Sequence, residues 1–168
     1  ALEAARVAPP RPRREKVPLN VTIPVISAED ARRRVFDNPG CATAKVKVAD
    51  TRSDLERDCQ RVEAVAEALV ELHGASAKVR VDANGAFKHT EALKRMEQLS
   101  RFDIHSIEQP IKQGNTKELA RLCRETPLPI ALDEELIGIN GGEEKKKLIE
   151  YVRPQYLVLK PSLHGGMA

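Results

Sequence analysis

The chain has 168 residues and a formal net charge of +3, with 41% hydrophobic and 32% charged residues, the composition of a soluble globular protein. Aromatic residues make up only 3% of the chain and Trp is absent, so nothing favours a surface that stacks nucleic-acid bases. No apolar run approaches the roughly 18 residues of a membrane span, and the first residues lack the apolar core of a signal peptide. We therefore expect no nucleic-acid and no membrane partner, and we predict a cytoplasmic location.

The first 18 residues predict a flexible segment. Basic side chains stand there among several prolines, which disfavour both helix and central strand. A solvated run of charge accounts for these residues, and we assign them no function. The sequence thus divides into a basic, proline-rich segment over residues 1–18 and a folded domain over residues 19–168.

Six β-rich runs alternate with five helical patterns along the domain. The first run, Leu19–Pro24, is short and contains β-branched residues, and the second, Thr43–Val48, alternates in polarity. Each of the four later runs ends on a charged residue, in order Asp82, Glu108, Asp133 and Lys160.

Helical spacing of apolar residues fills the intervals between these runs. Capping pairs are predicted at three helix starts, namely Ser27 with Asp30, Ser53 with Glu56, and Asn115 with Glu118. The second helix is the best defined, and Gly74 follows its end. The third helix follows Thr90, and the fifth covers Glu143–Val152.

The constant order of strand and then helix calls for right-handed crossovers and a parallel sheet. The charged residues that end the last four runs are 26, 25 and 27 residues apart, about the length of one strand and helix unit. A doubly wound sheet gathers its functional groups at one switch point, whereas every run from the second to the sixth carries a charge here. We therefore predict an α/β fold, a TIM-like (β/α) barrel with about six of its eight strands.

The three acids Asp82, Glu108 and Asp133 would then lie at one edge of the sheet. Neighbouring carboxylates at low dielectric repel one another by something on the order of several kcal/mol unless a cation joins them. Oxygen ligands without His or Cys suit a hard ion, which predicts a Mg²⁺ site. Each acid alone could equally be a helix cap or a loop charge, but their constant spacing favours the metal site.

Three lysines would flank this site. Lys45 and Lys47 share one face of the second run, and Lys160 ends the last run. Lysines are common on an exposed edge strand, which is the alternative for the first two. Burial and mutual repulsion are expected to lower the pKa of lysines packed in this way. Such a lysine can take a proton from the carbon next to a carboxylate.

The phrases KVK, VDANG, IEQP, LDEE and LKPS together resemble the enolase superfamily, in particular its muconate-lactonizing branch. Sites of this superfamily use a Lys or His base with Mg²⁺. The longer phrases RVDANGAF, DIHSIEQPIKQG, TPLPIALDEELIG and RPQYLVLKPSLHGG are similar to the o-succinylbenzoate synthases of menaquinone biosynthesis. The resemblance extends from about residue 18 to the end of the chain.

The resemblance implies a Mg²⁺-dependent lyase with a small-molecule carboxylate substrate. The reaction would be the syn dehydration of 2-succinyl-6-hydroxy-2,4-cyclohexadiene-1-carboxylate to o-succinylbenzoate. Lys47 would remove the α-proton and then help the hydroxyl leave, Lys45 would assist it and contact the carboxylate, and Lys160 would stabilise the enolate from the opposite side. Among the remaining residues, the implied Mg²⁺ ligands are Asp82, Glu108 and Asp133, supported by Asn84 and Gln109.

Members of the family have an N-terminal capping domain and two further barrel strands without counterpart here, so we expect a partial barrel that lacks the capping domain. Two alternatives stay open. A dipeptide epimerase or N-acylamino acid racemase would use Lys47 and Lys160 as opposed bases. A barrel fragment without activity would act as an assembly unit and self-associate through open sheet edges.

Overall fold

The computed structural model describes residues 15–50, 54–139 and 141–163. Of the predicted basic segment, residues 15–18 are described, and they are exposed and belong to no strand or helix. The strands are β1 (Asn20–Ile23), β2 (Thr43–Lys47), β3 (Lys78–Asp82), β4 (Ile104–Glu108), β5 (Ile130–Leu132) and β6 (Tyr156–Leu157). The α-helices are α1 (Ala28–Phe36), α2 (Leu55–His73), α3 (His89–Leu99), α4 (Thr116–Glu125) and α5 (Gly142–Val152).

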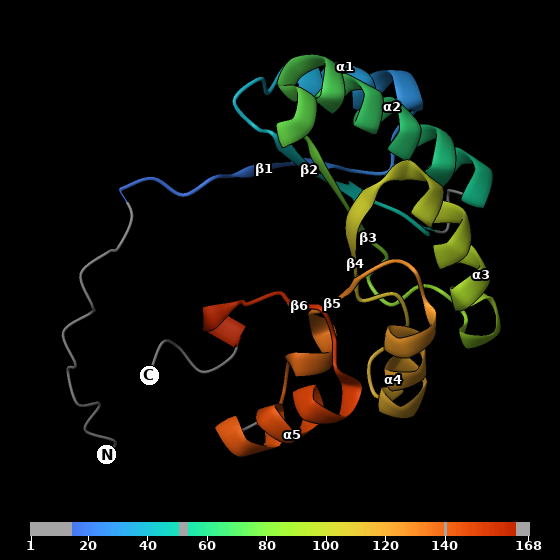
Figure 1. The fold of residues 1–168 in the computed structure, drawn as a ribbon, viewed down its shortest axis with the longest axis vertical. Coiled ribbons are helices and arrows are strands. Elements are labelled where there is room, and N and C mark those ends of the chain that lie inside the picture. Colours follow the sequence, from blue (N-terminus) through green and yellow to red (C-terminus); the bar gives the residue numbers. More distant parts are fainter. Residues whose placement is uncertain (1–14, 51–53, 140, 164–168) are drawn as a thin grey trace.

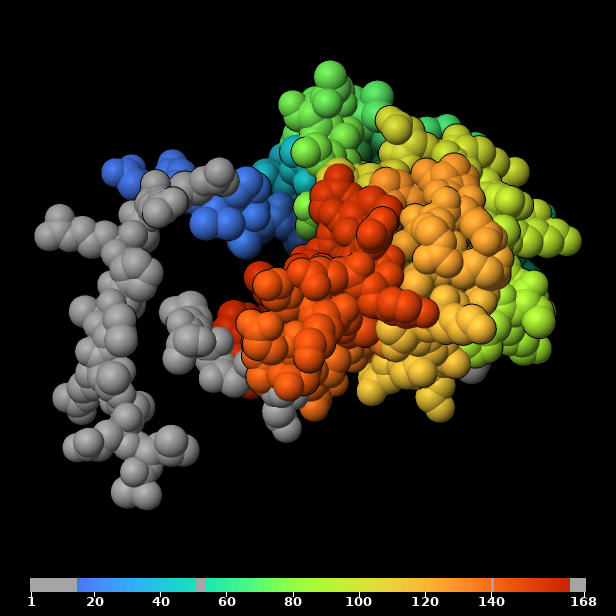
Figure 2. Space-filling view, turned by 60° about the horizontal axis from the view of Figure 1, so that its bottom comes forward, coloured from blue at the N-terminus to red at the C-terminus, as the bar shows by residue number. Residues whose placement is uncertain are grey.

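The six strands form one parallel sheet in the order of the sequence, from β1 at one edge to β6 at the other. Figure 1 shows the sheet as an arc, with the helices following one another around its outer side. Figure 2 shows the C-terminal part of the arc, in orange and red, lying against α4, in gold. The predicted alternation of strands and helices and the parallel sheet are therefore confirmed.

The core lies between the outer face of the sheet and the helices. Along β2, Ala44 and Val46 are completely buried, whereas Lys45 and Lys47 are partly exposed on the opposite face. Burial of a large aliphatic side chain stabilises a fold by about 1.5–3 kcal/mol. The fully buried aliphatic residues include Ile23, Val35, Val62, Val65, Leu69, Val81, Met96, Leu99, Ile107, Leu119, Leu122, Ile130, Leu132 and Val152. This packing leaves the inner face of the arc for polar side chains.

Helix caps match the sequence in one case and differ in two others. Ser27 caps α1, and its hydroxyl accepts the Asp30 amide N–H at 3.1 Å, as predicted. Asn115 occupies the N-cap position of α4, but its side-chain amide donates to the Lys112 carbonyl and not to the helix. The cap of α2 is Asp54, whose carboxylate accepts the Arg57 amide N–H at 2.9 Å. The predicted cap Ser53 lies outside the described residues.

Several predicted boundaries differ from the structure by one residue or more. Helix α3 begins at His89, one residue before Thr90, and Lys88 stands at its N-cap position. Strand β6 ends at Leu157 and does not reach Lys160, because β5, its pairing partner, has only three residues. Lys160 therefore stands between β6 and a short 3-10 turn at Pro161–Leu163. Among the described helices, none has both the length and the apolar character needed to cross a membrane.

Candidate active site

The register of the parallel strands places the predicted site residues in one row. Lys47 on β2 pairs with Asp82 on β3, and Asp82 pairs with Glu108 on β4. All three stand at the carboxyl ends of their strands. Asp133 directly follows β5, and Lys160 contacts it from the far edge of the sheet. The structure thus brings all the predicted acids and lysines together along the carboxyl ends of the strands.

Asp82 is the most strongly paired of the acids. Its side chain is fully buried, and its Oδ2 lies 2.6 Å from the Lys47 Nζ and 3.2 Å from the Lys45 Nζ. Its Oδ1 accepts the Asn84 amide N–H at 3.0 Å. Burial alone would raise the pKa of Asp82, but the two lysines and this amide outweigh it and lower the pKa. Asp82 is therefore held as a carboxylate.

Glu108 lies between two other acids and has weaker compensation. Burial raises the pKa of its carboxyl group to about 7, and the negative charges of Asp82 and Asp133 add to this shift. Lys45 opposes the shift, with its Nζ 3.5 Å from the Glu108 Oε2. Glu108 therefore accepts a proton more readily than an ordinary glutamate side chain.

Asp133 is fully buried, and its Oδ2 accepts a hydrogen bond from the Lys160 Nζ. That hydrogen bond is the main reason why the pKa of Lys160 is raised. Burial, the largest single effect on Lys45, would lower its pKa, yet Asp82 and Glu108 together raise it. The predicted lowering of lysine pKa is therefore wrong for these two lysines when only the protein's own charges act, because each is paired with at least one buried carboxylate.

The donor set fits a hard cation in its chemistry. The Glu108 Oε1 and the Asp133 Oδ1 are buried and accept no hydrogen bond from an N–H or hydroxyl group of the described residues, and the two carboxyl groups lie close enough to share a proton. Buried carboxylate oxygens that lack partners are the groups that a divalent cation would satisfy. Among the residues that the structure describes, no three acidic, His or Cys side chains are already arranged to hold a metal ion, and the Asp82 carboxylate faces two lysines.

Asn84 and Gln109 support this row from adjacent loops. The Asn84 Oδ1 accepts from the Lys47 Nζ at 2.7 Å, and its Nδ2 donates to Glu134 at 3.0 Å. The buried Gln109 Oε1 accepts the amide N–H groups of Asp133 and Glu135 at 3.3 and 3.1 Å. Both residues have positive φ, 44° for Asn84 and 38° for Gln109, which is uncommon for side chains other than glycine and concentrates at functional sites.

Gly85 completes the turn after β3. It has a φ of 74°, and a Cβ at this position would lie 3.0 Å from the Lys112 Cα. The turn can approach the loop after β4 this closely because glycine has no side chain. The VDANG phrase therefore has a structural reason as well as a chemical one.

A family model described as enolase C-terminal domain-like matches residues 27–168. This chain belongs to that family. The resemblance of its motifs to the enolase superfamily is confirmed. The row of acids and lysines lies at the carboxyl ends of the strands, which is the end of a (β/α) barrel where the βα loops gather.

Relatives of known name share much of this sequence. The o-succinylbenzoate synthase of Desulfotalea psychrophila is 41% identical over 138 residues, which are 82% of this chain and 35% of that protein. The o-succinylbenzoate synthase of Thermobifida fusca is 38% identical over 165 residues, which are 98% of this chain and 49% of that protein. The chain thus spans less than half the length of these curated relatives.

Solved structures with the same fold include MenC from Desulfotalea psychrophila, with a TM-score of 0.78 and 38% identity over 90% of this chain and 40% of that chain. The muconate lactonizing enzyme of Pseudomonas fluorescens, complexed with muconolactone, has a TM-score of 0.78 and 27% identity. The match covers 92% of this chain and 40% of that one. An enolase from Bradyrhizobium, complexed with magnesium and mandelic acid, shares the fold at 23% identity and a TM-score of 0.66. This match covers 84% of this chain and 38% of that one. The predicted partial (β/α) barrel of this superfamily is confirmed.

Two cavities adjoin the row in this member of the family. One, of about 470 Å³, is lined by Lys47, Ala49 and Asn84 at the carboxyl ends of the strands. The other, of about 310 Å³, is lined by Lys45 and Glu108 together with side chains deeper in the arc. Lys47 lines the first cavity and Lys45 lines the second, so the two lysines of the KVK phrase border different cavities.

Sequence reasoning missed several polar groups around the site. Glu135 is buried and accepts from the Gly114 amide at 3.0 Å and the Thr116 hydroxyl at 2.9 Å, which ties the loop after β4 to the turn after β5. Asp58 and Arg61 are also buried, on α2. Their burial could have been inferred from the sequence, because this charged pair lies on the same helix face as Val62 and Val65.

We predict that Gln109→Leu lowers the free energy of unfolding by about 2–4 kcal/mol, because it leaves two buried backbone N–H groups without their acceptor. Urea unfolding measures this change. The matched control is Gln60→Leu on the exposed face of α2, which should change stability by less than about 0.5 kcal/mol. Equal, small effects of the two substitutions would contradict the role of Gln109.

Proposed function

We propose that this chain carries the catalytic residues of an o-succinylbenzoate synthase, a Mg²⁺-dependent lyase that dehydrates 2-succinyl-6-hydroxy-2,4-cyclohexadiene-1-carboxylate to o-succinylbenzoate. The observation that carries the proposal is a row of buried carboxylates flanked by Lys45 and Lys47 on one side and Lys160 on the other. The similarity to synthases of known name supports this choice of substrate.

The reaction needs a base, a stabilised negative charge and a proton for the leaving hydroxyl. Lys47 is proposed as the base, because its Nζ lies at the 470 Å³ cavity between Asp82 and Asn84. Its neutral amine takes the α-proton, and the resulting ammonium returns a proton to the departing hydroxyl as water forms. Lys160 holds positive charge on the opposite side of the substrate, where it stabilises the enolate.

Asp82, Glu108 and Asp133 are the proposed Mg²⁺ ligands. When bound, Mg²⁺ supplies positive charge to the substrate carboxylate as the neighbouring carbon loses its proton. Lys45 lies between two of these acids and balances their charge. Asn84 and Gln109 hold the surrounding loops, so the acids need little reorganisation during the reaction.

A second candidate function is epimerisation or racemisation of dipeptides or N-acylamino acids. The observation that favours it is the position of lysines on both sides of the acids, since such reactions need a base on each face. A dipeptide epimerase from Enterococcus faecalis shares the fold, with a TM-score of 0.76 at 24% identity. The identity to synthases is higher, and we therefore favour dehydration.

The substrate test uses the full-length gene product with Mg²⁺. We expect turnover of the cyclohexadiene carboxylate, measured by chromatography of o-succinylbenzoate, and no comparable turnover of a panel of dipeptides and N-acylamino acids. Turnover of the panel alone would replace dehydration by epimerisation or racemisation. Turnover of neither class would contradict both functions.

Three further proposals concern the chain as a whole. Its division is a basic segment over residues 1–18 and a catalytic barrel domain over residues 19–168, and its location is cytoplasmic. Its partner is a small-molecule carboxylate. Self-association through the sheet edges is the alternative for a chain without activity, and it is motivated by the exposure of Leu19 and Leu159. A strictly monomeric species in size-exclusion chromatography would argue against self-association.

We predict that Mg²⁺ raises the melting temperature of the protein and that Asp82→Asn, Glu108→Gln and Asp133→Asn each abolish this rise. A ligand that binds only the folded state at 100 times its Kd stabilises it by about 2.7 kcal/mol. Differential scanning fluorimetry measures the shift without any substrate. Glu150→Gln, an exposed change of the same kind on α5, is the control and should keep the full shift. An unchanged Mg²⁺ response in all three site variants would refute the ligand assignment.

We predict that Lys47 and Lys160 have separable roles. Removal of a general acid–base group slows a reaction by about 10²–10⁴-fold, so Lys47→Ala should lose turnover and also exchange of the substrate α-proton in deuterium oxide. Lys160→Arg keeps positive charge and should retain weak exchange. NMR of the recovered substrate measures it. If exchange survives in Lys47→Ala and vanishes in Lys160→Arg, the base lies on the other face.

A further inference from the structure

A buried ion pair lies behind the site, and the proposed mechanism does not use it. Asp58 and Arg61 stand one helical turn apart on α2, their side chains are only 1% and 2% exposed, and they are paired with each other. Buried charges cost several kcal/mol to desolvate, so a buried pair contributes little stability compared with apolar residues of the same size. Its other contacts therefore indicate what it does.

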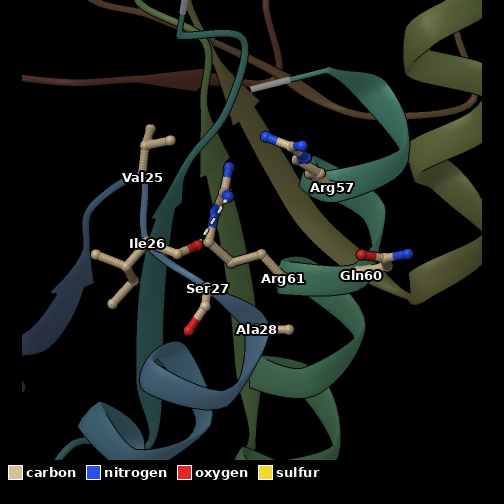
Figure 3. A pocket seen from close by; sticks show the side chains of 7 residues that line it. All are labelled: Val25, Ile26, Ser27, Ala28, Arg57, Gln60 and Arg61. Carbon is tan, nitrogen blue, oxygen red and sulfur yellow. Dashed lines mark hydrogen bonds between the residues drawn. The ribbon is translucent and has the colours of Figure 1, made fainter. Parts of the chain in front are cut away.

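The guanidinium of Arg61 joins two loops at the carboxyl end of the sheet. It donates to the carbonyl oxygen of Lys47 at 3.0 Å and to the carbonyl oxygen of Ile26 at 3.1 Å. Figure 3 shows the Arg61 side chain reaching from α2 to Ile26, in the segment between β1 and α1. One side chain thus fixes the main chain of the proposed base and of the neighbouring loop.

Asp58 holds the next part of the same main chain. Its Oδ2 accepts the Ala49 amide N–H at 2.7 Å, and Ala49 has a φ of 64°. A non-glycine residue in this left-handed region costs about 1–2 kcal/mol, which these buried contacts offset. The Val48 amide N–H donates to the Asp82 carbonyl oxygen at 3.0 Å. Residues 47–49 are therefore held by three hydrogen bonds from two elements, α2 and β3.

The loop between β1 and α1 borders two cavities. One, of about 450 Å³, lies between this loop and the first turns of α2, and the other is the 470 Å³ cavity of Lys47. Val25 lines both cavities. Ile26 packs partly against the hydrophobic core, and the hydrogen bond from Arg61 to its carbonyl oxygen is a polar contact that also fixes this wall.

We propose that Arg61, oriented by Asp58, is a positioning residue that sets where the Lys47 amine stands. The inference rests on the proposed role of Lys47 as the base. The Lys47 Nζ meets Asp82 and Asn84 at 2.6 and 2.7 Å, and these distances depend on where the strand end lies. Displacement of a reacting group by about 1 Å can slow catalysis by about 100-fold.

The test compares Arg61→Met and Arg61→Lys with Val65→Ala in the full-length protein. Val65 is fully buried one turn further along α2, and its truncation destabilises the helix packing while Asp58 and Arg61 stay in place. The first readout is the rate at which an amine-reactive reagent labels Lys47, relative to the exposed Lys94, measured by peptide mass spectrometry without substrate. The second is kcat and KM.

Both Arg61 variants should label Lys47 faster, by about 3-fold or more, and should lower kcat by about 10- to 100-fold with KM changed less than about 3-fold. Arg61→Lys should be the milder variant because it keeps the charge. Val65→Ala should lower the melting temperature and leave both readouts at the wild-type level. If the Arg61 variants lose stability but keep wild-type labelling and kcat, the pair is only structural and the proposal is overturned.

Labelling also separates this inference from the proposed function. If the wild-type protein turns over no substrate, the proposed function fails, and the labelling rates alone decide whether Arg61 positions Lys47. If Arg61→Met does not fold, Arg61→Lys and Asp58→Asn carry the comparison. In Asp58→Asn, faster labelling of Lys47 supports the proposal, and an unchanged rate contradicts it.

Discussion

Acids at the ends of three neighbouring strands can be buried together only if positive charge accompanies them, and this constraint shapes the inner face of the arc. Asp82 meets it with Lys47 and Lys45, and Asp133 meets it with Lys160. Glu108, between them, has only the more distant Lys45, and burial together with the neighbouring acids raises its pKa. Glu108 Oε1 and Asp133 Oδ1 accept no hydrogen bond among the described residues, and the proposed Mg²⁺ would supply them with a partner.

The same constraint explains why so much of the surrounding backbone is fixed by side chains. A loop that bears a buried charge cannot rely on water to satisfy its amide groups, so protein groups must do so. Gln109 holds the turn after β5, Glu135 ties that turn to the loop after β4, and Asn84 joins Lys47 to Glu134. The polar network therefore connects the loops after successive strands into one continuous rim.

The row was predictable because the spacing of the acids along the chain matches the length of one strand and helix unit. Acids about one strand and helix unit apart must meet when the strands are parallel and in sequence order, as Asp82 and Glu108 do. The exact end of β6 was not predictable, because it depends on how far the short β5 extends, and Lys160 therefore stands beyond the strand. The direction of the lysine pKa shifts was missed because it depends on distances of a few ångström between side chains, which spacing along the chain does not give. Asp58 and Arg61 were missed because charged residues on a helix usually lie on its solvent-exposed face.

The positions of the three lysines also bear on the choice between dehydration and racemisation. Lys45 lies between Asp82 and Glu108, and the raised pKa keeps it an ammonium group, so it suits charge compensation and not proton transfer. Lys160 is bound to a buried carboxylate that also raises its pKa, which favours a fixed positive charge on that face. Lys47 has one acidic partner and one neutral amide and faces the larger of the two cavities beside the row. Lys47 and Lys160 each lie against a buried carboxylate, so two opposed bases would require both lysines to be neutral in turn, whereas dehydration with one base and one stabilising cation requires only one of them to lose its charge.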